Sequence, residues 1–258
     1  MMTDRGYTSD EIMSIVAARQ LRDGQVCFVG IGLPSEAANL ARLSHAPNVV
    51  LIYESGTIGT RPDVLPLSIG DGELADQADL VVSVPEIFAY WLQAGRVDVG
   101  FLSAAQIDRF GNLNSTVIGP YDQPRVRLPG AGGAPEIASS AGEVIVMLRQ
   151  SQRTFVEAVD FVSSVGFGRN GEGRTGHRGG GPTVVITDLC VLRPHPDTNE
   201  LELVAVHPGI EVDAVVAATG WKLRVATDVG RVDPPTEEEL SILRGLKERT
   251  SLAHLGHL

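Results

Sequence analysis

The sequence predicts an α/β fold, a mostly parallel sheet flanked by helices with an antiparallel addition. Residues 25–53 follow the order strand, glycine loop, helix, strand, which is typical of a parallel βαβ unit. Residues 183–206 contain three short apolar runs separated by turns, which predict an antiparallel meander. With 258 residues, 43% hydrophobic and 21% charged, the chain has the size and composition of one globular domain over 1–258.

Capping and turn residues place the elements of the first half of the chain. Thr8 followed by Glu11 has the form of a capping box, so a helix is expected at 10–22, ended by Asp23-Gly24. Ser35 is expected to cap a second helix. The other expected elements are a strand at 25–30, the helix from Ser35 to 43, a strand at 48–53, a short strand or buried turn at 80–84, a helix at 86–94 opened by Pro85, and a strand at 97–104.

The second half begins with a polar hairpin at 106–114, in which Gly111 permits positive φ. The basic, glycine-rich segment 169–181 has no periodic pattern, which favours a mobile loop. The other expected elements are a loop region at 119–134, strands at 143–148, 183–187, 190–193 and 200–206, and helices at 212–219 and 237–247, the last capped by Thr236.

Composition excludes several classes of function. A formal net charge of −11 argues against a general nucleic-acid binder. No apolar stretch is long enough to span a bilayer, and the N-terminus lacks the apolar region of a signal peptide, so a cytoplasmic protein is expected. Cys27 and Cys190 lie in apolar runs and are expected to be core thiols. The six histidines share no metal-ligand spacing, so no metal site is expected.

Glu54 is the first candidate for chemistry. It ends the apolar run Val49–Tyr53 and opens the turn Ser55-Gly56. A carboxylate at the C-terminal end of a buried strand lies where α/β sheets usually keep their active sites, and it is a potential nucleophile. Taken alone, the same pattern also describes a solvated strand end.

Two glycine clusters are candidates for ligand binding. Gly30–Pro34 joins a strand to a helix, as a phosphate or pantetheine cradle would, but it lacks the third glycine of a dinucleotide fingerprint. Gly130–Ala134 can bring backbone N–H groups close to a ligand, which suits an oxyanion hole or an anion nest, although a flexible surface loop has the same composition. Asn112 and Asn114 supply neutral hydrogen-bonding groups shortly upstream of the second cluster.

The ordered set of motifs resembles the B subunits of family I CoA-transferases, in particular those of the glutaconate type. The matching stretches are Gly30-Ile31-Gly32-Leu33-Pro34, Ala46-Pro47-Asn48, Glu54-Ser55-Gly56, Ser68-Ile69-Gly70-Asp71, Ala105-Gln106-Ile107-Asp108, Gly111-Asn112-Leu113-Asn114-Ser115-Thr116, Gly130–Ala134 and Pro182–Asp188. The resemblance implies the fold shared by ribose-phosphate isomerases, glucosamine-phosphate isomerases and CoA-transferases.

The resemblance also implies an activity, which is ping-pong transfer of CoA between an acyl-CoA and a free carboxylic acid. Glu54 would attack the thioester and then carry CoA as a glutamyl thioester. The backbone N–H groups of Gly132 and Gly133 would stabilise the oxyanion. The residues expected to bind substrate or CoA are Gly30, Gly32, Ser55, Asn112, Asn114 and Gly130. No permanently bound cofactor is implied, since CoA is a substrate.

Members of this family work with an A (alpha) subunit, so a heterotetramer or larger assembly is expected. The main alternative activity is hydrolysis or ring cleavage of an acyl-CoA, with Glu54 as general base. A steroid-ring hydrolase subunit with this fold lacks both the glutamate and the glycine run, and their presence here favours transfer. A non-enzymatic sensor or scaffold that binds acyl-CoA or a sugar phosphate is the third possibility.

Overall fold

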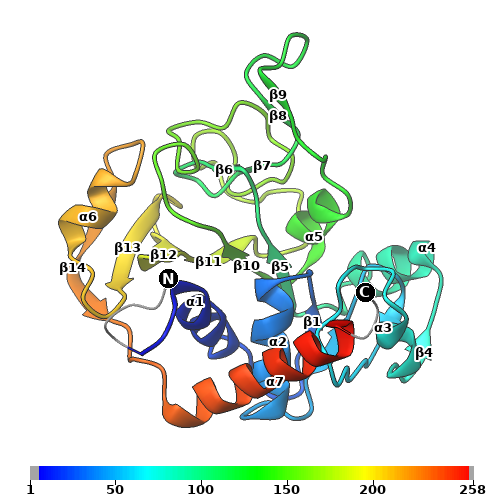
Figure 1. Ribbon diagram of the computed structural model, residues 1–258. Coiled ribbons are helices and arrows are strands. Elements are labelled where there is room, and N and C mark those ends of the chain that lie inside the picture. Colours follow the sequence, from blue (N-terminus) through cyan, green and yellow to red (C-terminus); the bar gives the residue numbers. More distant parts are fainter. Residues whose placement is uncertain (1–5, 256–258) are drawn as a thin grey trace. The chain divides into compact units, whose positions relative to one another are not determined.

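The computed structural model describes residues 6–255, which form two compact units (Figure 1). Within the described residues, the first unit contains residues 6–101 and 234–255, and the second contains residues 102–233. The expectation of a single domain over 1–258 stays a prediction. Each unit is built on a β-sheet, and the strand pairings confirm the predicted α/β class.

The sheet of the first unit has a parallel part and an antiparallel edge. Its strands are β1 (Val26–Phe28), β2 (Val50–Ile52), β3 (Thr57–Ile58), β4 (Leu80–Val81) and β5 (Val99–Leu102). β1 pairs in parallel with β2 and β5, whereas β2, β3 and β4 pair antiparallel in that order. The parallel pairing aligns the carboxyl ends of β1 and β2, so the loops that follow these two strands lie at the same edge of the sheet.

Three helices of this unit pack together: α1 (Ser9–Ala18), α2 (Leu33–Leu43) and α7 (Glu237–Leu255) (Figure 1). Ion pairs join α7 to the other two helices or their ends: Arg19–Glu239 at 2.7 Å, Arg244–Glu11 at 2.7 Å and Lys247–Glu36 at 3.0 Å. Ser14 on α1 donates to the Glu36 carboxylate on α2. The C-terminal helix is therefore tied to the N-terminal part of the chain.

Most helix-start signals of this unit are confirmed. Thr8 and Glu11 form the predicted capping box, and Thr236 caps α7 through a bond from the Glu239 amide to its hydroxyl. The first helix ends at Ala18, earlier than predicted, and α7 extends beyond the predicted 247. The prediction that Ser35 caps α2 is wrong, because Gly32 is the cap and Ser35 lies inside the helix.

The segment between β3 and β5 is less regular than predicted. It contains α3 (Gly72–Asp76), which was not predicted, the strand β4, and α4 (Val84–Glu86) continued by the π-helix η1 (Ile87–Leu92). The sequence predicted either a short strand or a buried turn here, and the structure has a strand, β4. Its residues Leu80 and Val81 are exposed. Asp71 caps α3 by accepting a bond from the Glu73 amide.

The sheet of the second unit contains the predicted meander. Its strands are β10 (Glu143–Met147), β11 (Pro182–Ile186), β12 (Cys190–Pro194), β13 (Leu201–Val206) and β14 (Arg224–Arg231). β10 and β11 are parallel, β11, β12 and β13 are antiparallel in succession, and β14 adds in parallel to β13. β14 was not predicted from the sequence. Helix α6 (Val212–Ala217) connects β13 to β14, close to its expected position.

Two small hairpins and a short helix complete this unit. The predicted hairpin is β6 (Gln106–Ile107) with β7 (Leu113–Asn114), and Gly111 in its turn has φ +72° as expected. The region 119–134, expected to be a loop, contains β9 (Val126–Arg127), which pairs with β8 (Val117–Ile118) just before it in a hairpin that projects from the rest of the unit (Figure 1). Helix α5 (Ala134–Ser140) follows the second glycine cluster.

The basic segment 169–181 has neither helix nor strand, as predicted, but Arg174 anchors it. The Arg174 guanidinium donates to the carbonyl oxygens of Gly179 at 2.7 Å, Gly166 at 2.6 Å and Ala138. These carbonyls come from different parts of the unit, so one side chain fixes the path of the segment. Its predicted mobility stays a prediction.

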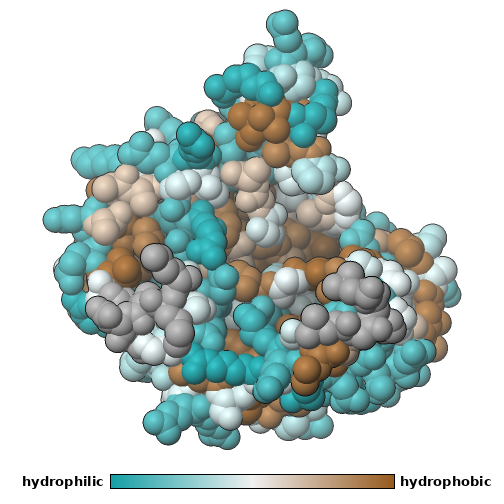
Figure 2. Space-filling model, viewed as in Figure 1, coloured by the Kyte–Doolittle hydropathy of each residue, from teal (hydrophilic) through white to brown (hydrophobic). Residues whose placement is uncertain are grey.

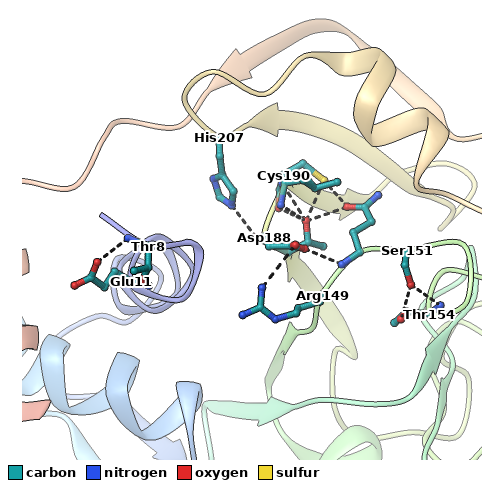
Figure 3. Close-up of polar contacts among 11 residues, drawn as sticks. Thr8, Glu11, Arg149, Ser151, Thr154, Asp188, Cys190 and His207 are labelled. Carbon is teal, nitrogen blue, oxygen red and sulfur yellow. Dashed lines mark hydrogen bonds and ion pairs between the residues drawn. The ribbon is translucent and has the colours of Figure 1, made fainter. Parts of the chain in front are cut away.

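A buried polar cluster closes the turn between β11 and β12 (Figure 3). The Thr187 hydroxyl accepts bonds from the amides of Leu189 and Cys190 and donates to the side-chain oxygen of Gln150. His207 is 1% exposed, and its Nε2 lies 2.7 Å from the Thr187 carbonyl oxygen. Because a carbonyl can only accept, Nε2 carries the proton in this contact.

The His207 ring predicts a pH dependence of stability. Burial lowers the pKa of His207, although Thr187 and Asp188 act in the opposite direction. The unfolded chain therefore takes up the proton first as the pH falls below about 6.5, and stability decreases there. Unfolding of the wild type in urea should show this loss of stability as the pH is lowered through about 6.5. His207→Gln, which keeps a donor for Thr187, should flatten it; an unchanged slope would exclude His207 as its source.

Candidate functional site

Glu54 lies in a tight turn between the antiparallel strands β2 and β3. The Gly56 amide donates to the Tyr53 carbonyl at 3.0 Å, so Glu54 and Ser55 are the two central residues of a four-residue turn. The Tyr53 amide donates to the Thr57 carbonyl at 3.1 Å and continues the ladder up to the turn. The Glu54 side chain is half-buried. A carboxylate is thus held on a short, hydrogen-bonded turn directly after a buried strand.

Gly56 is required by the backbone of this turn. Its φ is +102°, in the region that side chains disfavour, and a Cβ placed there would lie 1.9 Å from the Val82 carbonyl oxygen. The Val82 amide donates to the Gly56 carbonyl at 2.9 Å. The glycine therefore lets the chain after β4 pack directly against the turn that carries Glu54.

A chain of side-chain bonds connects the Glu54 turn to the first glycine cluster. Ser35 Oγ donates to the Gly30 carbonyl at 2.9 Å and lies 3.1 Å from the Tyr53 hydroxyl. Since the Ser35 proton is used by Gly30, the Tyr53 hydroxyl donates to Ser35. Burial raises the pKa of Tyr53 to about 12, so this hydroxyl keeps its proton at neutral pH. The loop after β1 and the turn after β2 therefore form one bonded edge of the unit; the predicted binding roles of Gly30 and Gly32 stay predictions.

Two hydroxyls in and just after the turn, those of Ser55 and Thr57, are unsatisfied. Ser55 Oγ and Thr57 Oγ1 are both buried and have no hydrogen-bond partner among residues 6–255. Buried polar groups are normally paired, so two orphan hydroxyls within three residues of Glu54 are unusual. They could accept or donate a bond when a ligand is present. Ser55 was among the residues predicted to bind substrate; Thr57 was not.

Asn112 and Asn114 are fully buried in the second unit and bonded within it. Asn112 Nδ2 donates to the Asp108 carboxylate at 2.9 Å and to the Gly168 carbonyl at 2.8 Å. Asn114 Nδ2 donates to Gln106 Oε1 at 2.7 Å. Burial raises the pKa of Asp108 although the bonds from Asn112 oppose this. Ligand binding by the two amides stays a prediction, and it would compete with these internal bonds.

The second glycine cluster also lies in the second unit, just before α5. Gly130 and Gly132 have positive φ values of +111° and +52°, and the Gly130 amide donates to the Ser115 carbonyl. Within the described part of the chain, the amides of Gly132 and Gly133 have no hydrogen-bond acceptor. They are therefore available as donors, and their predicted approach to Glu54 stays a prediction.

Metal-binding clusters and membrane-spanning helices are absent from residues 6–255. In this range, no group of three or more His, Cys, Asp or Glu side chains could hold a metal ion. Within the same part of the chain, no helix has the length and apolar character needed to cross a membrane. Cys27 and Cys190 are free and buried, as expected of core thiols. A cytoplasmic location stays a prediction.

Comparison with known proteins decides the family. The sequence profile of the family described as Coenzyme A transferase matches residues 11–218. The chain belongs to this family. The match includes every residue proposed above for the site, from Gly30 to Gly133.

Three relatives place the chain more closely within the CoA-transferase family. It is 59% identical over 250 residues to the B subunit of 3-oxoadipate CoA-transferase from Pseudomonas knackmussii, covering 96% of each chain. It is 34% identical to the B subunit of glutaconate CoA-transferase from Acidaminococcus fermentans, covering 92% of this chain and 91% of that one. The crystal structure of that enzyme matches with a TM-score of 0.86 at 31% identity over 93% and 94% of the two chains, in agreement with the predicted fold. Identity falls to 26% for the cholesterol ring-cleaving hydrolase IpdB subunit of Mycobacterium tuberculosis, with 95% and 96% covered.

Several positioning residues of this CoA-transferase chain were missed from the sequence. Ser35 and Tyr53 connect the glycine loop to the Glu54 turn, and Thr57 adds an orphan hydroxyl. Tyr53 was interpreted only as part of an apolar strand. Its hydroxyl was the available signal, because a tyrosine at the end of a buried strand usually needs a polar partner.

Proposed function

We propose that this chain is the B subunit of a heteromeric CoA-transferase and that Glu54 is its nucleophile. A Glu54 carboxylate oxygen attacks the thioester carbonyl of an acyl-CoA, and CoA leaves as thiolate. The product is a mixed anhydride between the acyl group and Glu54. The thiolate then attacks the glutamyl carbonyl and releases the first carboxylate, so Glu54 carries CoA as a thioester.

The second half reaction reverses these steps with another acid. The incoming carboxylate attacks the glutamyl thioester and forms a new anhydride with release of CoA thiolate. The thiolate attacks the acyl carbonyl of that anhydride, which regenerates the Glu54 carboxylate. Each step exchanges acyl derivatives of similar reactivity, so the protein has to provide positioning and stabilisation of the oxyanion.

The turn geometry is the observation that carries this proposal. A nucleophile gains from being held in place, and Glu54 is a central residue of a turn closed by the Gly56–Tyr53 hydrogen bond. The orphan hydroxyls of Ser55 and Thr57 are suited to bind a substrate oxygen beside it. The free amides of Gly132 and Gly133 are proposed as oxyanion donors, and loss of such a donor typically costs about 100- to 1000-fold in rate.

The substrate is proposed to be a dicarboxylic acid of the 3-oxoadipate type. The support is the 59% identity to the B subunit of a 3-oxoadipate CoA-transferase, against 34% to that of the glutaconate enzyme. CoA is thereby a substrate and not a permanently bound cofactor. The partner is proposed to be an A subunit, in a heterotetramer or larger assembly, because the relatives are named as B subunits.

Product analysis separates transfer from hydrolysis. The chain is combined with its A subunit and given 3-oxoadipyl-CoA, with and without a second carboxylic acid. Transfer predicts a new acyl-CoA that appears only when the acid is present, with total CoA thioester conserved. Free CoA and 3-oxoadipate released at the same rate without an acceptor would instead establish the alternative, in which Glu54 acts as general base for hydrolysis.

A further inference from the structure

The backbone pairing of β1 with β2 ends just before the loop and the turn that carry the candidate site. The ladder ends where the Val29 amide donates to the Ile52 carbonyl at 2.8 Å. The next residues of the two strands are joined through a side chain instead, because Ser35 Oγ donates to the Gly30 carbonyl and accepts from the Tyr53 hydroxyl. A side-chain link therefore replaces the backbone ladder one residue before the proposed nucleophile.

Ser35 belongs to a polar stripe along one face of α2. Asn39 lies four residues after it and Arg42 three residues further, a spacing that puts the three side chains on the same side of a helix. Ser35 and Asn39 are 1% and 0% exposed, and Arg42 is half-buried. A buried helix face is normally apolar, so polar side chains on it need hydrogen-bond partners. Ser35, Asn39 and Arg42 together form the α2 stripe.

The α2 stripe is bonded from end to end, and it reaches both β2 and β3, the strands that flank the turn. Asn39 Nδ2 donates to the Ser35 carbonyl at 3.0 Å, and its Oδ1 accepts from Arg42 Nε at 3.2 Å. Arg42 Nη2 donates at 2.9 Å to the carbonyl of Pro62, on the chain that leaves β3. At its other end, the stripe is bonded to the end of β2 through Tyr53.

The hydroxyl and amide groups of this network are too deeply buried to touch a substrate. The face of the molecule in Figure 2 is a mixture of hydrophilic and hydrophobic residues. Ser35, Asn39 and Tyr53 contribute almost nothing to any surface, since each is at most 1% exposed. An effect of these side chains on a reaction therefore has to act through the backbone that they hold, which is the loop after β1 and the two strands around the turn.

We propose that the α2 stripe and Tyr53 are positioning residues, which fix the turn of Glu54 relative to the Gly30–Pro34 loop. The proposal rests on the proposed function and adds the device that aligns its nucleophile. Misplacement of a reacting group by about 1 Å can cost about 100-fold in rate. Because Tyr53 directly precedes Glu54, loss of its bond lets the turn shift while every group that touches the substrate is still present.

The test measures how fast Glu54 acquires CoA in a single turnover. An excess of the A/B complex is mixed with 3-oxoadipyl-CoA without an acceptor acid and quenched at intervals, and the CoA adduct on the Glu54 peptide is quantified by mass spectrometry. The variants are Tyr53→Phe, Ser35→Ala, the combination of these two, Arg42→Met and Arg42→Lys. Phenylalanine keeps the buried ring of Tyr53, and alanine is a good helix former in place of Ser35.

Ser14→Ala is the matched control. Ser14 is fully buried on α1, and its hydroxyl donates to the carboxylate of Glu36 on α2 at 3.0 Å. This variant also loses one buried side-chain bond to α2, but the bond points away from the glycine loop and the turn. Glu36 keeps its ion pair with Lys247. A purely structural role of the stripe would make the control and the stripe variants behave alike.

Tyr53→Phe and Ser35→Ala should each slow adduct formation by about 10- to 100-fold, with little change in the acyl-CoA concentration that gives half the maximal rate. The double variant should be no slower than the slower single variant, because both substitutions remove the same bond. Arg42→Met should also be slow, Arg42→Lys should recover part of the loss, and Ser14→Ala should react as wild type. Rates equal to that of Ser14→Ala, or a loss in the double variant equal to the product of the single losses, would overturn the proposal.

Hydrogen exchange keeps this result separate from the proposed chemistry. Amide exchange in the A/B complex is followed in the peptides that contain Gly30–Pro34 and Glu54. If wild type forms no CoA adduct on Glu54, the proposed function fails, and exchange still decides whether the stripe holds these two segments together. Faster exchange of both peptides in Tyr53→Phe, with Ser14→Ala like wild type, supports the assignment; equal exchange in all three proteins refutes it.

Discussion

Replacing Glu54 by glutamine is expected to reduce CoA transfer by about 10,000-fold or more, as loss of a covalent nucleophile does in other enzymes. The amide has nearly the same shape, but its nitrogen and neutral oxygen cannot form the anhydride or carry CoA as a thioester. Glu54 makes no ion pair among the described residues that the substitution would break. Assembly with the A subunit and thermal stability should therefore stay at the wild-type level, and the loss should appear in kcat.

Glu248→Gln is the matched control. Glu248 is an exposed glutamate on α7 of the same unit, away from the strand ends, and its replacement should leave transfer unchanged. If the Glu54 variant retains more than a few per cent of wild-type turnover in a correctly assembled complex, Glu54 is not the nucleophile.

Replacing Gly56 by alanine is expected to have the largest effect on stability. The added methyl group would lie 1.9 Å from the Val82 carbonyl oxygen, and φ is +102°, so either the turn or β4 has to move. A cost of about 3–5 kcal/mol is typical of a severe backbone clash, and for a chain of this size it lowers Tm by about 10 °C. Activity should fall as well, because the displaced turn carries Glu54.

Alanine substitutions at two other glycines separate the two causes of this effect, the steric clash and the backbone strain. Gly24 has φ +78° but nothing within 4 Å of the position that a Cβ would occupy, so Gly24→Ala should cost only about 1 kcal/mol of backbone strain. Gly72 has no positive φ and open space around it, and Gly72→Ala in α3 should be neutral or slightly stabilising. Thermal unfolding of the three variants should follow this order. A Gly56→Ala protein as stable as Gly72→Ala would mean that the turn does not depend on close packing against Val82.

Local signals in the sequence predicted local features of the fold well. The capping box at Thr8 and Glu11 and the positive φ of Gly111 each depend on neighbouring residues, and both were correct. Ser35 was misassigned for a reason that is partly local: Pro34 is tolerated in the first helical turn, so α2 begins at Leu33 with Gly32 as its cap. The Ser35 hydroxyl was then free to bond to Gly30, which no capping rule predicts.

Features that depend on contacts distant in sequence were missed. β14 is largely exposed and polar, and it is a strand because it pairs with β13. The bonds of Asn112 to Asp108 and Gly168, which hold the hairpin to a later segment, were not anticipated. The sequence located the carboxylate of the candidate site, and the structure supplied the turn and hydroxyls around it.

The most direct test of the central claim is detection of CoA on Glu54. The A/B complex is incubated with 3-oxoadipyl-CoA without an acceptor acid, digested and examined by mass spectrometry, with a parallel sample treated with borohydride. We expect the peptide containing Glu54 to gain the mass of CoA less one water. In the borohydride sample, we expect the Glu54 side chain to be reduced to an alcohol. An unmodified Glu54 peptide in a complex that still transfers CoA would contradict the covalent role of this residue.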